Sequence, residues 1–240
     1  MVLSSSKMTP TPLQNALYKN AGAFHNVVPF DATRDSLLQL DFTANNTTLT
    51  DHILANTDAF AKYIEQQLGT KYKYGIGGYA EHRTIYSRSS RFDKGEEPRR
   101  LHLGIDVWGP VGTPIFAPLG GYVHSFSFND FFGDYGATII LHHQLEGVSF
   151  NTLYGHLSLR DIEGIQEGHY ISRGVEFAHF GPPKENGYWP AHLHFQIVTE
   201  MYEKRGDYPG VCRYSQKEKY LENCPDPDLI LQMMQYAVKA

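Results

Sequence analysis

The stretch HLGIDVWGPVGTPIFAPLGGYVHSF at residues 102–126 decides the fold class. In it, short apolar runs alternate with Gly and Pro, which is typical of short strands joined by tight turns. Evenly spaced strands of this kind predict a largely antiparallel sheet or sandwich. Four further segments of the same texture follow it: GATIILHHQ at 136–144, SFNTLYGHL at 149–157, HYISRGVEFAHFG at 169–181 and AHLHFQIV at 191–198.

The residues on either side of this stretch have a different texture. Residues 1 to about 30 are polar and small and are predicted to be a loop. Apolar and polar residues alternate over 38–42, which predicts a half-buried strand. Apolar residues recur at four-residue spacing over 57–68 and predict a helix ended by Gly69. After the core, CPDPDLILQMMQYAV at 224–238 predicts one C-terminal helix.

Length and composition bound the organisation of the chain. Its 240 residues suffice for one large domain or two small ones. With 41% hydrophobic and 13% aromatic residues, the chain folds rather than staying disordered. The sequence therefore predicts a mainly β fold, α+β overall, with a compact antiparallel sheet or sandwich core and a C-terminal helix. Residues 1–70 are predicted to be a small mixed N-terminal appendage, and residues 71–240 the main domain, in one folding unit.

Charge, apolar runs and cysteines exclude several classes of protein. The net charge of −5 provides no bulk attraction to nucleic acid. No window approaches the roughly 20 apolar residues of a membrane span, and the N-terminus lacks the apolar run of a signal peptide. The chain is therefore expected to be soluble and cytosolic. Cys212 and Cys224 show no CxxC pattern, so they are either two thiols or one bridge.

His102 and Asp106 lie four positions apart in HLGID. On a straight strand that spacing is about 13 Å, which is too far for both side chains to share one metal ion. Gly104 tolerates backbone angles that other residues avoid, so it permits a bend between them. We therefore expect His102 to reach in from a loop and Asp106 to point inward from the strand that follows.

His192 and His194 alternate with apolar residues in AHLHF. Both imidazoles therefore project from one face of a strand, about 6.6 Å apart. One of them can bind a metal ion while the other stands over the bound water. His156 in LYGHL lies beside a Gly at a predicted junction of strand and turn; alone, a His in that place is more often structural.

Together these residues favour a catalytic metal centre. Two His and one Asp supply three ligands to a divalent ion and leave a fourth position for water, which is typical of catalytic zinc sites. Zinc lowers the pKa of that water towards neutrality and polarises a carbonyl. Two further His residues suit proton transfer and stabilisation of the oxyanion or the leaving amine.

Four motifs in this order carry a resemblance to a known family: HLGID at 102–106, GTPIFAPLGGYV at 112–123, LYGHL at 153–157 and AHLHF at 191–195. They resemble the lysostaphin-type (LytM-like) zinc endopeptidases, which cut peptide cross-links in bacterial cell walls. The resemblance spans about residues 76–200 and implies a zinc peptidase-like domain over 71–240. It implies zinc ligands at His102, Asp106 and His194, and catalytic roles for His156 and His192.

The function implied by this resemblance is that of a zinc metalloendopeptidase. It would hydrolyse peptide bonds in bacterial cell-wall (peptidoglycan) cross-links by attack of a zinc-bound water, with Zn2+ as cofactor and a peptide or peptidoglycan as substrate. A cell-wall substrate requires export. One alternative is a catalytically silent binding or regulatory module that partners other hydrolases, although every ligand is present. Another is an iron oxygenase with two His and one carboxylate, whose usual first motif is HxD rather than HxxxD.

Further residues near the metal motifs are candidates for substrate contacts. Glu81 and Arg83 precede the metal motif and can line the cleft and hold a substrate carboxylate or carbonyl, with a solvated hairpin as the alternative. Trp108, Tyr188 and Trp189 flank the motifs and are expected to pack in the core rather than form a wall for a peptide.

Overall fold

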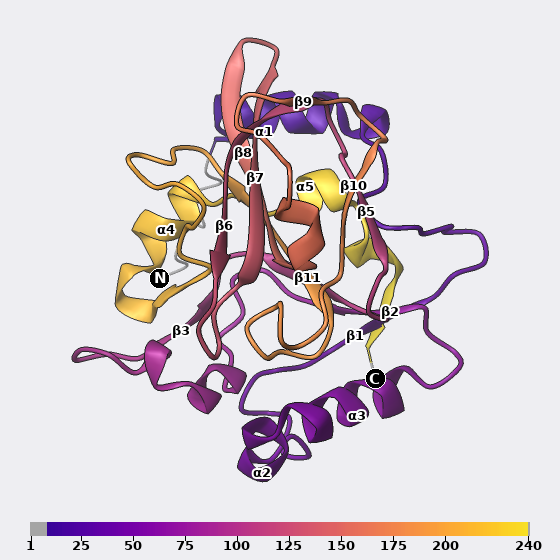
Figure 1. Cartoon of the computed structure of the whole chain (residues 1–240), viewed down its shortest axis with the longest axis vertical. Helices are drawn as coiled ribbons and strands as arrows, with labels where there is room; N and C mark the ends of the chain where they lie inside the picture. The colour runs from indigo at the N-terminus through magenta and orange to yellow at the C-terminus, as the bar shows by residue number, and fades with distance from the viewer. Residues whose placement is uncertain (1–8, 240) are drawn as a thin grey trace, which may run out of the picture.

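The computed structural model describes residues 9–239, and a nine-stranded sheet forms its centre (Figure 1). Its strands lie in the order β13-β1-β2-β4-β11-β8-β7-β6-β9. They are β1 (Leu37–Gln39), β2 (Tyr74–Gly77), β4 (Ile105–Trp108), β6 (Gly121–Asn129), β7 (Gly136–Leu145), β8 (Val148–Leu157), β9 (Tyr170–Ile171), β11 (His192–Val198) and β13 (Ala237–Lys239).

Two small sheets accompany the large one. One pairs β5 (Pro114–Phe116) with β10 (Glu176–His179), and the other pairs β3 (Arg99–His102) with β12 (Val211–Arg213). Both are antiparallel, and in the large sheet only β1 runs parallel to its neighbours, β13 and β2. The prediction of a mainly β fold with few helices is therefore confirmed.

The helices lie at the periphery of the sheet. The α-helices are α1 (Pro12–Lys19), α2 (Asp51–Ala55), α3 (Thr57–Leu68), α4 (Lys217–Asn223) and α5 (Asp228–Leu231). The 3-10 helices are η1 (Ala21–Ala23), η2 (Ile85–Arg88), η3 (Ser90–Phe92), η4 (Leu159–Ile162), η5 (Tyr214–Gln216) and η6 (Met234–Tyr236). Among the described residues, no helix has both the length and the apolar character needed to cross a membrane.

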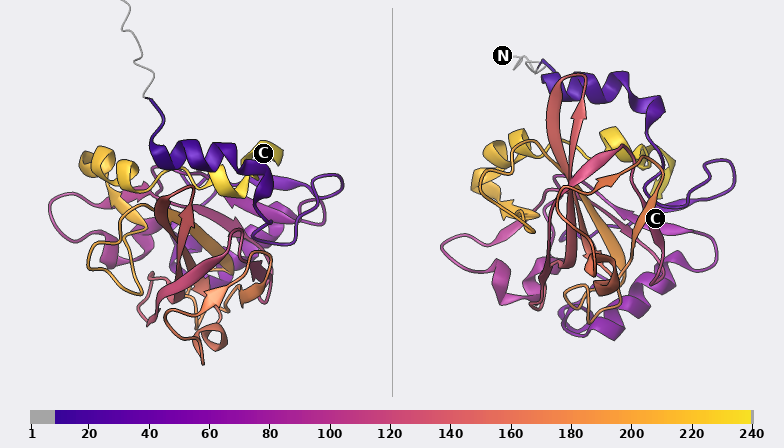
Figure 2. Two further views of the ribbon diagram at one scale, coloured as in Figure 1. Left: turned by 90° about the horizontal axis from the view of Figure 1, so that it is seen from above. Right: turned by 45° about the horizontal axis from the view of Figure 1, so that its top comes forward.

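The N-terminal segment contains a helix where the sequence suggests a loop. Thr11 caps α1: its hydroxyl accepts from the Gln14 amide, and the Gln14 side chain accepts from the Thr11 amide. This reciprocal cap and the Pro at position 12 favour the start of a helix, so the loop prediction is wrong from residue 12 to 19. Residues 1–8 lie outside the described part. Figure 2 shows α1 close to α5, with which it is in contact.

The helix predicted over 57–68 is α3. Asn56 caps its first turn by accepting from the Ala59 amide at 3.0 Å, and Gly69 ends it in the left-handed region at φ +52°. Its buried side chains belong to an apolar cluster shared with Leu38, Leu40 and Phe42, near β1, and with Trp108 of β4. The apolar face of α3 is thus buried against the sheet.

The C-terminal helix is shorter than predicted. Helix α5 ends at Leu231 because Gln232 adopts a left-handed conformation with φ +52°. The Asp228 carboxylate then accepts from the amides of Met233 and Met234, which turns the chain away from the helix axis. Residues 237–239 leave the helical path altogether and pair with β1 as β13.

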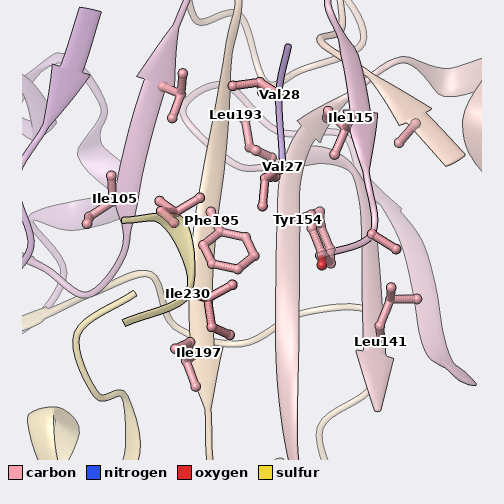
Figure 3. Close-up of a cluster of buried hydrophobic side chains, with 14 of the residues drawn as sticks. Val27, Val28, Ile105, Ile115, Leu141, Tyr154, Leu193, Phe195, Ile197 and Ile230 are labelled. Carbon is pink, nitrogen blue, oxygen red and sulfur yellow. The ribbon is translucent and has the colours of Figure 1, made fainter. Parts of the chain in front are cut away.

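The two faces of the central strands carry different side chains. On β11, Leu193, Phe195 and Ile197 belong to the large apolar cluster, in which they lie near Ile230 (Figure 3). The alternate residues of β11, His192, His194 and Gln196, lie outside that cluster and are also buried. Because side chains alternate across a strand, one face of the sheet forms the apolar core and the other carries polar chemistry.

Strand β1 joins the predicted N-terminal appendage to the predicted main domain. It pairs with β2 in the register Leu37 to Tyr74, across the proposed boundary at residue 70. The division into residues 1–70 and 71–240 stays a prediction.

A truncation tests how strongly the first segment is joined to the rest. A chain beginning at Tyr72 lacks β1 and α3, so it exposes one edge of β2 and the apolar surface around Trp108. We expect this fragment to be aggregated or inactive, because burial of apolar area is the main stabilising contribution to the fold. Size-exclusion chromatography, together with an assay of the peptide hydrolysis that the sequence motifs imply, checks this against the full chain. A soluble fragment with raised activity would mean that residues 1–70 only cover the site.

Candidate active site

Three buried side chains bring one ligand atom each to a common point. The His102 Nε2 atom lies 3.0 Å from His194 Nδ1 and 3.2 Å from Asp106 Oδ1, and the last two atoms are 3.1 Å apart. Asp106 on β4 and His194 on β11 face each other directly in the sheet register. His102 reaches the same point from the end of β3. All three side chains are buried, and together they form a candidate metal site.

Hydrogen bonds fix which imidazole nitrogens carry protons. The His102 Nδ1 atom lies 3.1 Å from the Gly78 carbonyl, which can only accept, so this nitrogen donates and Nε2 keeps its lone pair. The His194 Nε2 atom lies 2.8 Å from Gln196 Oε1, and the Gln196 amide nitrogen donates to the Pro209 carbonyl. His194 therefore donates from Nε2 and keeps its lone pair on Nδ1. Partners of this kind orient metal-ligating histidines in general.

These donors fit zinc. Two imidazole lone pairs and a carboxylate oxygen converge with no proton between them, so a cation is needed to offset their mutual repulsion. Tetrahedral zinc with bonds of about 2.0–2.2 Å holds its ligands roughly 3.3–3.5 Å apart, close to the separations of 3.0–3.2 Å found here. His102, Asp106 and His194 would hold the ion and leave a fourth position open.

Arg83 is the closest charged neighbour of this cluster. Its side chain is completely buried, and its Nη1 atom donates to Asp106 Oδ2 at 2.5 Å, on the oxygen that does not face the histidines. Its Nε atom donates to Glu81 at 2.7 Å. Burial alone would raise the pKa of Asp106, but His102 and Arg83 hold that pKa well below its usual range. Asp106 is therefore ionised, as a metal ligand must be.

This placement differs from the expected substrate contact. Arg83 faces the interior and Asp106, while Glu81 borders a separate polar hollow near Asn46 and Lys239. Neither side chain lines the cavity that holds the histidines. The structure thus associates Arg83 with the position and charge of Asp106.

Gly104 contributes through its size rather than through an unusual backbone angle. Its φ is not in the left-handed region, and a Cβ atom there would lie 2.5 Å from the His194 ring and 2.7 Å from the Phe195 carbonyl. No side chain fits at that distance. The bend expected at Gly104 does separate β3 from β4, but the glycine is required because the His194 imidazole occupies the space beside it.

His156 and His192 lie together next to the ligand cluster. Their ring centroids are 4.1 Å apart, and His192 stacks on Trp108 at 3.8 Å with an interplanar angle of 12°. The His156 Nδ1 atom lies 2.8 Å from the Asn186 carbonyl, and the His192 Nδ1 atom lies 2.8 Å from the Pro190 carbonyl. Both rings therefore donate from Nδ1 and keep a lone pair on Nε2.

The backbone of His156 has an unusual conformation. Its φ of +64° lies in the left-handed region, which residues other than Gly adopt rarely and at a cost of order 1 kcal/mol or more. Its amide donates to the Tyr135 carbonyl at 2.8 Å, and its carbonyl accepts from Gly181 at 2.9 Å. Surrounding backbone groups thus hold His156 in place at the end of β8.

Burial keeps both imidazoles neutral. It lowers the pKa of His192 to about 4 and the pKa of His156 well below its ordinary value, the latter with a further contribution from the adjacent His192. At neutral pH each ring therefore has a free Nε2 lone pair that can accept a proton.

One cavity connects these groups. Asp106, His156, His192 and His194 all line it. Its walls include the aromatic residues Tyr86, Trp108, Tyr135 and Trp189. Trp108 and Trp189 thus belong both to the buried core, as expected, and to the wall of the site. The prediction of core packing is wrong for Tyr188, which is 39% exposed and does not line the cavity.

Two neighbours of His194 were not singled out by the sequence reasoning. Gln196 is the next residue on the same face of β11, so the two-residue period that places His192 and His194 together could have revealed it. The Tyr135 hydroxyl lies 3.3 Å from His194 Nε2. Tyr135 comes from the turn between β6 and β7, and no local pattern indicates that it approaches β11.

Comparison with known proteins gives one family. Residues 100–206 match the family model of Peptidase family M23. This segment contains the three candidate ligands and both further histidines. No curated protein sequence matches the chain significantly.

Several solved structures are similar over part of the chain. The catalytic domain of the antimicrobial peptidase lysostaphin from Staphylococcus simulans shares 20% identity, with 66% of this chain and 97% of that domain covered and a TM-score of 0.39. A zinc-containing peptidase from Vibrio cholerae shares 26% identity over 41% of this chain and 27% of its own, with a TM-score of 0.33. The present chain thus covers about a quarter of the Vibrio protein.

The M23 match and the buried His-Asp-His cluster coincide in residues 100–206, and the resemblance of the sequence motifs points the same way. Residues 100–206 are thus similar to the peptidases of family M23, in agreement with the lysostaphin-type resemblance of the motifs.

Proposed function

We propose that this protein is a zinc metalloendopeptidase and that its substrates are the peptide cross-links of bacterial cell walls. The observation that supports this most directly is the arrangement inside one cavity. Two neutral imidazoles with free Nε2 lone pairs lie beside a cluster of three unprotonated ligand atoms. A metallohydrolase requires this combination of an open cation site and a nearby proton acceptor.

Each group has a defined task in this proposal. Zinc, when bound, supplies Lewis-acid activation of water and of the scissile carbonyl. His156 and His192 accept a proton at Nε2 and return one to the leaving amine, since both Nδ1 atoms are held by backbone carbonyls. The stack on Trp108 restricts rotation of the His192 ring. The aromatic walls exclude water from the reacting groups.

The direct experiment uses two kinds of substrate. The purified, zinc-loaded protein is incubated with intact cell-wall sacculi and with synthetic cross-link peptides, and newly exposed amines are quantified. Release of amines from both supports the proposal, and the Asp106→Ala variant is the matched control. Cleavage of soluble peptides alone would separate the peptidase activity from the cell-wall substrate. No cleavage of either would favour the silent binding module, and iron rather than zinc in the active protein would favour an oxygenase.

Variants of the two further histidines test their roles. We expect His156→Ala and His192→Ala to keep zinc and fold but to lose on the order of a hundredfold or more in kcat, as for other positioned proton-transfer groups. Zinc content by elemental analysis and kcat on the same preparation check this. If either variant loses its zinc while His194→Ala keeps it, the roles within the HxH pair are reversed.

A further inference from the structure

The cavity that holds the histidines extends to a group of charged residues. Beyond Tyr135, its lining includes Arg91, Arg99, Asp134 and Asp207. We call this part the polar end of the cavity. Trp108 and Trp189 line the same cavity near the histidines. A peptide bound in this cavity would therefore have both the histidines and the polar end in the wall around it.

One guanidinium of the polar end already has a counter-charge. The Arg91 Nη2 atom lies 2.7 Å from the Asp134 carboxylate, which is buried. The Asp134 carboxylate also accepts from the Tyr135 amide at 3.0 Å. The charges of Arg91 and Asp134 thus offset each other without a ligand.

Arg99 differs from Arg91 in this respect. Its Nη2 atom donates to the Arg91 carbonyl at 2.8 Å, and its guanidinium lies 5.2 Å from the centre of the Phe92 ring. It forms no ion pair with any acidic residue within the range 9–239, and Asp207, which also lines this end, does not approach it closely enough to form one. Burial lowers the pKa of Arg99, as expected for a cation without a full counter-charge.

This arrangement fits a carboxylate ligand. A guanidinium offers five N–H donors in a planar fork, and only one intramolecular hydrogen bond is formed here. The hydrogen bond to the Arg91 carbonyl and the contact with the Phe92 ring restrict the Arg99 side chain, so less side-chain entropy is lost on binding. Carboxylates bind such a fork through two parallel hydrogen bonds.

We propose that Arg99 forms a subsite for a carboxylate of the peptide substrate, so that the site favours peptides with a free carboxylate close to the scissile bond. This inference rests on the proposed function, because it takes the ligand to be a peptide. The carboxylate can be a C-terminus or an acidic side chain, and both present the same two oxygens.

Binding can be followed without turnover. Trp108 and Trp189 are the only two tryptophans of the chain, and both line the cavity, so intrinsic fluorescence reports its occupancy. The probes are acetyl-triglycine with a free C-terminus and its C-terminal amide. Both peptides are achiral, so they suit a site that accepts L-residues and one that accepts D-residues. We expect the zinc-loaded protein to bind the free acid about tenfold more tightly than the amide, the typical effect of a hydrogen-bonded charge.

Two variants and one control connect this preference to Arg99. Arg99→Met is expected to bind the acid and the amide equally, and Arg99→Lys to keep part of the preference, since it retains the charge without the fork. Arg100→Met is the control, because Arg100 lies on the same strand, pairs with Asp93 and does not line the cavity. Unchanged zinc content and circular dichroism show that the variants are folded.

A second pair of probes separates the two sources of the carboxylate. Acetyl-Gly-Glu-Gly-amide and its Gln counterpart test an acidic side chain in place of the C-terminus. A preference for either carboxylate that disappears in Arg99→Met supports the subsite. Equal affinity for the charged and uncharged members of both pairs overturns it. The absence of a fluorescence change with all four peptides overturns it as well.

The test is separable from that of the proposed function. If the acid is preferred but no peptide is cleaved, the endopeptidase proposal fails and the subsite stands. If peptides are cleaved with the same kcat/KM whether acid or amide, and Arg99→Met changes nothing, the subsite fails and the endopeptidase proposal stands.

Discussion

His194→Ala, His102→Ala and Asp106→Ala are each expected to reduce the zinc content from about one ion per chain to near zero and to abolish peptide hydrolysis. Each removes one of three ligand atoms that lie 3.0–3.2 Å apart, and the two ligands that remain are too few to hold a zinc ion tightly. Elemental analysis after gel filtration measures the zinc content. The loss of activity follows because the Lewis acid is absent.

The control for these variants is His169→Ala. His169 is exposed and directly precedes β9, an edge strand four positions from β11 in the sheet order, so the zinc content and kcat of this variant are expected to match the unaltered protein. Any of the three ligand variants that keeps full metal occupancy identifies a residue that is not a ligand. Circular dichroism in the presence of a chelator separates the loss of metal from the loss of fold.

Arg83→Met is expected to destabilise the metal-free protein by about 3–5 kcal/mol, the typical cost of removing one partner of a buried ion pair. The guanidinium is completely buried and bonds to Asp106 and Glu81, so its removal leaves the Asp106 carboxylate buried and without its cation. Arg83→Lys keeps the charge but not the fork, so an intermediate loss is expected. Urea unfolding in the presence of a chelator measures the free energy of unfolding.

The matched control is Arg100→Met. Arg100 pairs with Asp93, which is nearly half exposed, so its loss is expected to cost no more than about 1 kcal/mol. A substrate-binding role for Arg83 makes a different prediction. It requires an unchanged free energy of unfolding together with a raised KM in Arg83→Met, and that result would contradict the positioning role.

The sequence predicts the histidine-bearing face of β11 well because a strand has a simple period. Alternation in AHLHF places His192 and His194 on one face, and the structure has them there, on a buried strand. The sheet register then sets His194 opposite Asp106. That pairing depends on contacts between segments that are distant in sequence, so no local pattern predicts it. Only the resemblance of the whole motif set indicated that the two residues lie together.

Other parts of the site have no local signature. Arg83 lies in a charged, polar stretch that suggests an exposed hairpin, yet the fold buries it against Asp106. Its burial requires space beside Gly77, where a Cβ atom would lie 2.5 Å from the guanidinium. Composition cannot show such a fit, because it depends on which backbone passes close to which side chain.

The C-terminal segment shows why helix propensity misleads near the end of a sheet. Residues 228–236 favour a helix by composition, but α5 stops after Leu231, and the Asp228 carboxylate then accepts from the backbone amides of Met233 and Met234. The next residues then pair with β1, so long-range sheet hydrogen bonds replace helical ones. Tertiary pairing thus overrides the local preference.

The pairing of β1 with β13 also bears on how the protein folds. Leu37 pairs with Ala237, so this edge of the sheet forms only when most of the chain has been brought together. Loop closure over such a separation has an entropic cost that rises slowly with length, but contacts this distant in sequence slow the folding rate. Until β13 arrives, β1 presents unpaired backbone groups to solvent, the kind of edge through which folding intermediates associate. Refolding yield should therefore depend on protein concentration more strongly than the stability of the finished fold does.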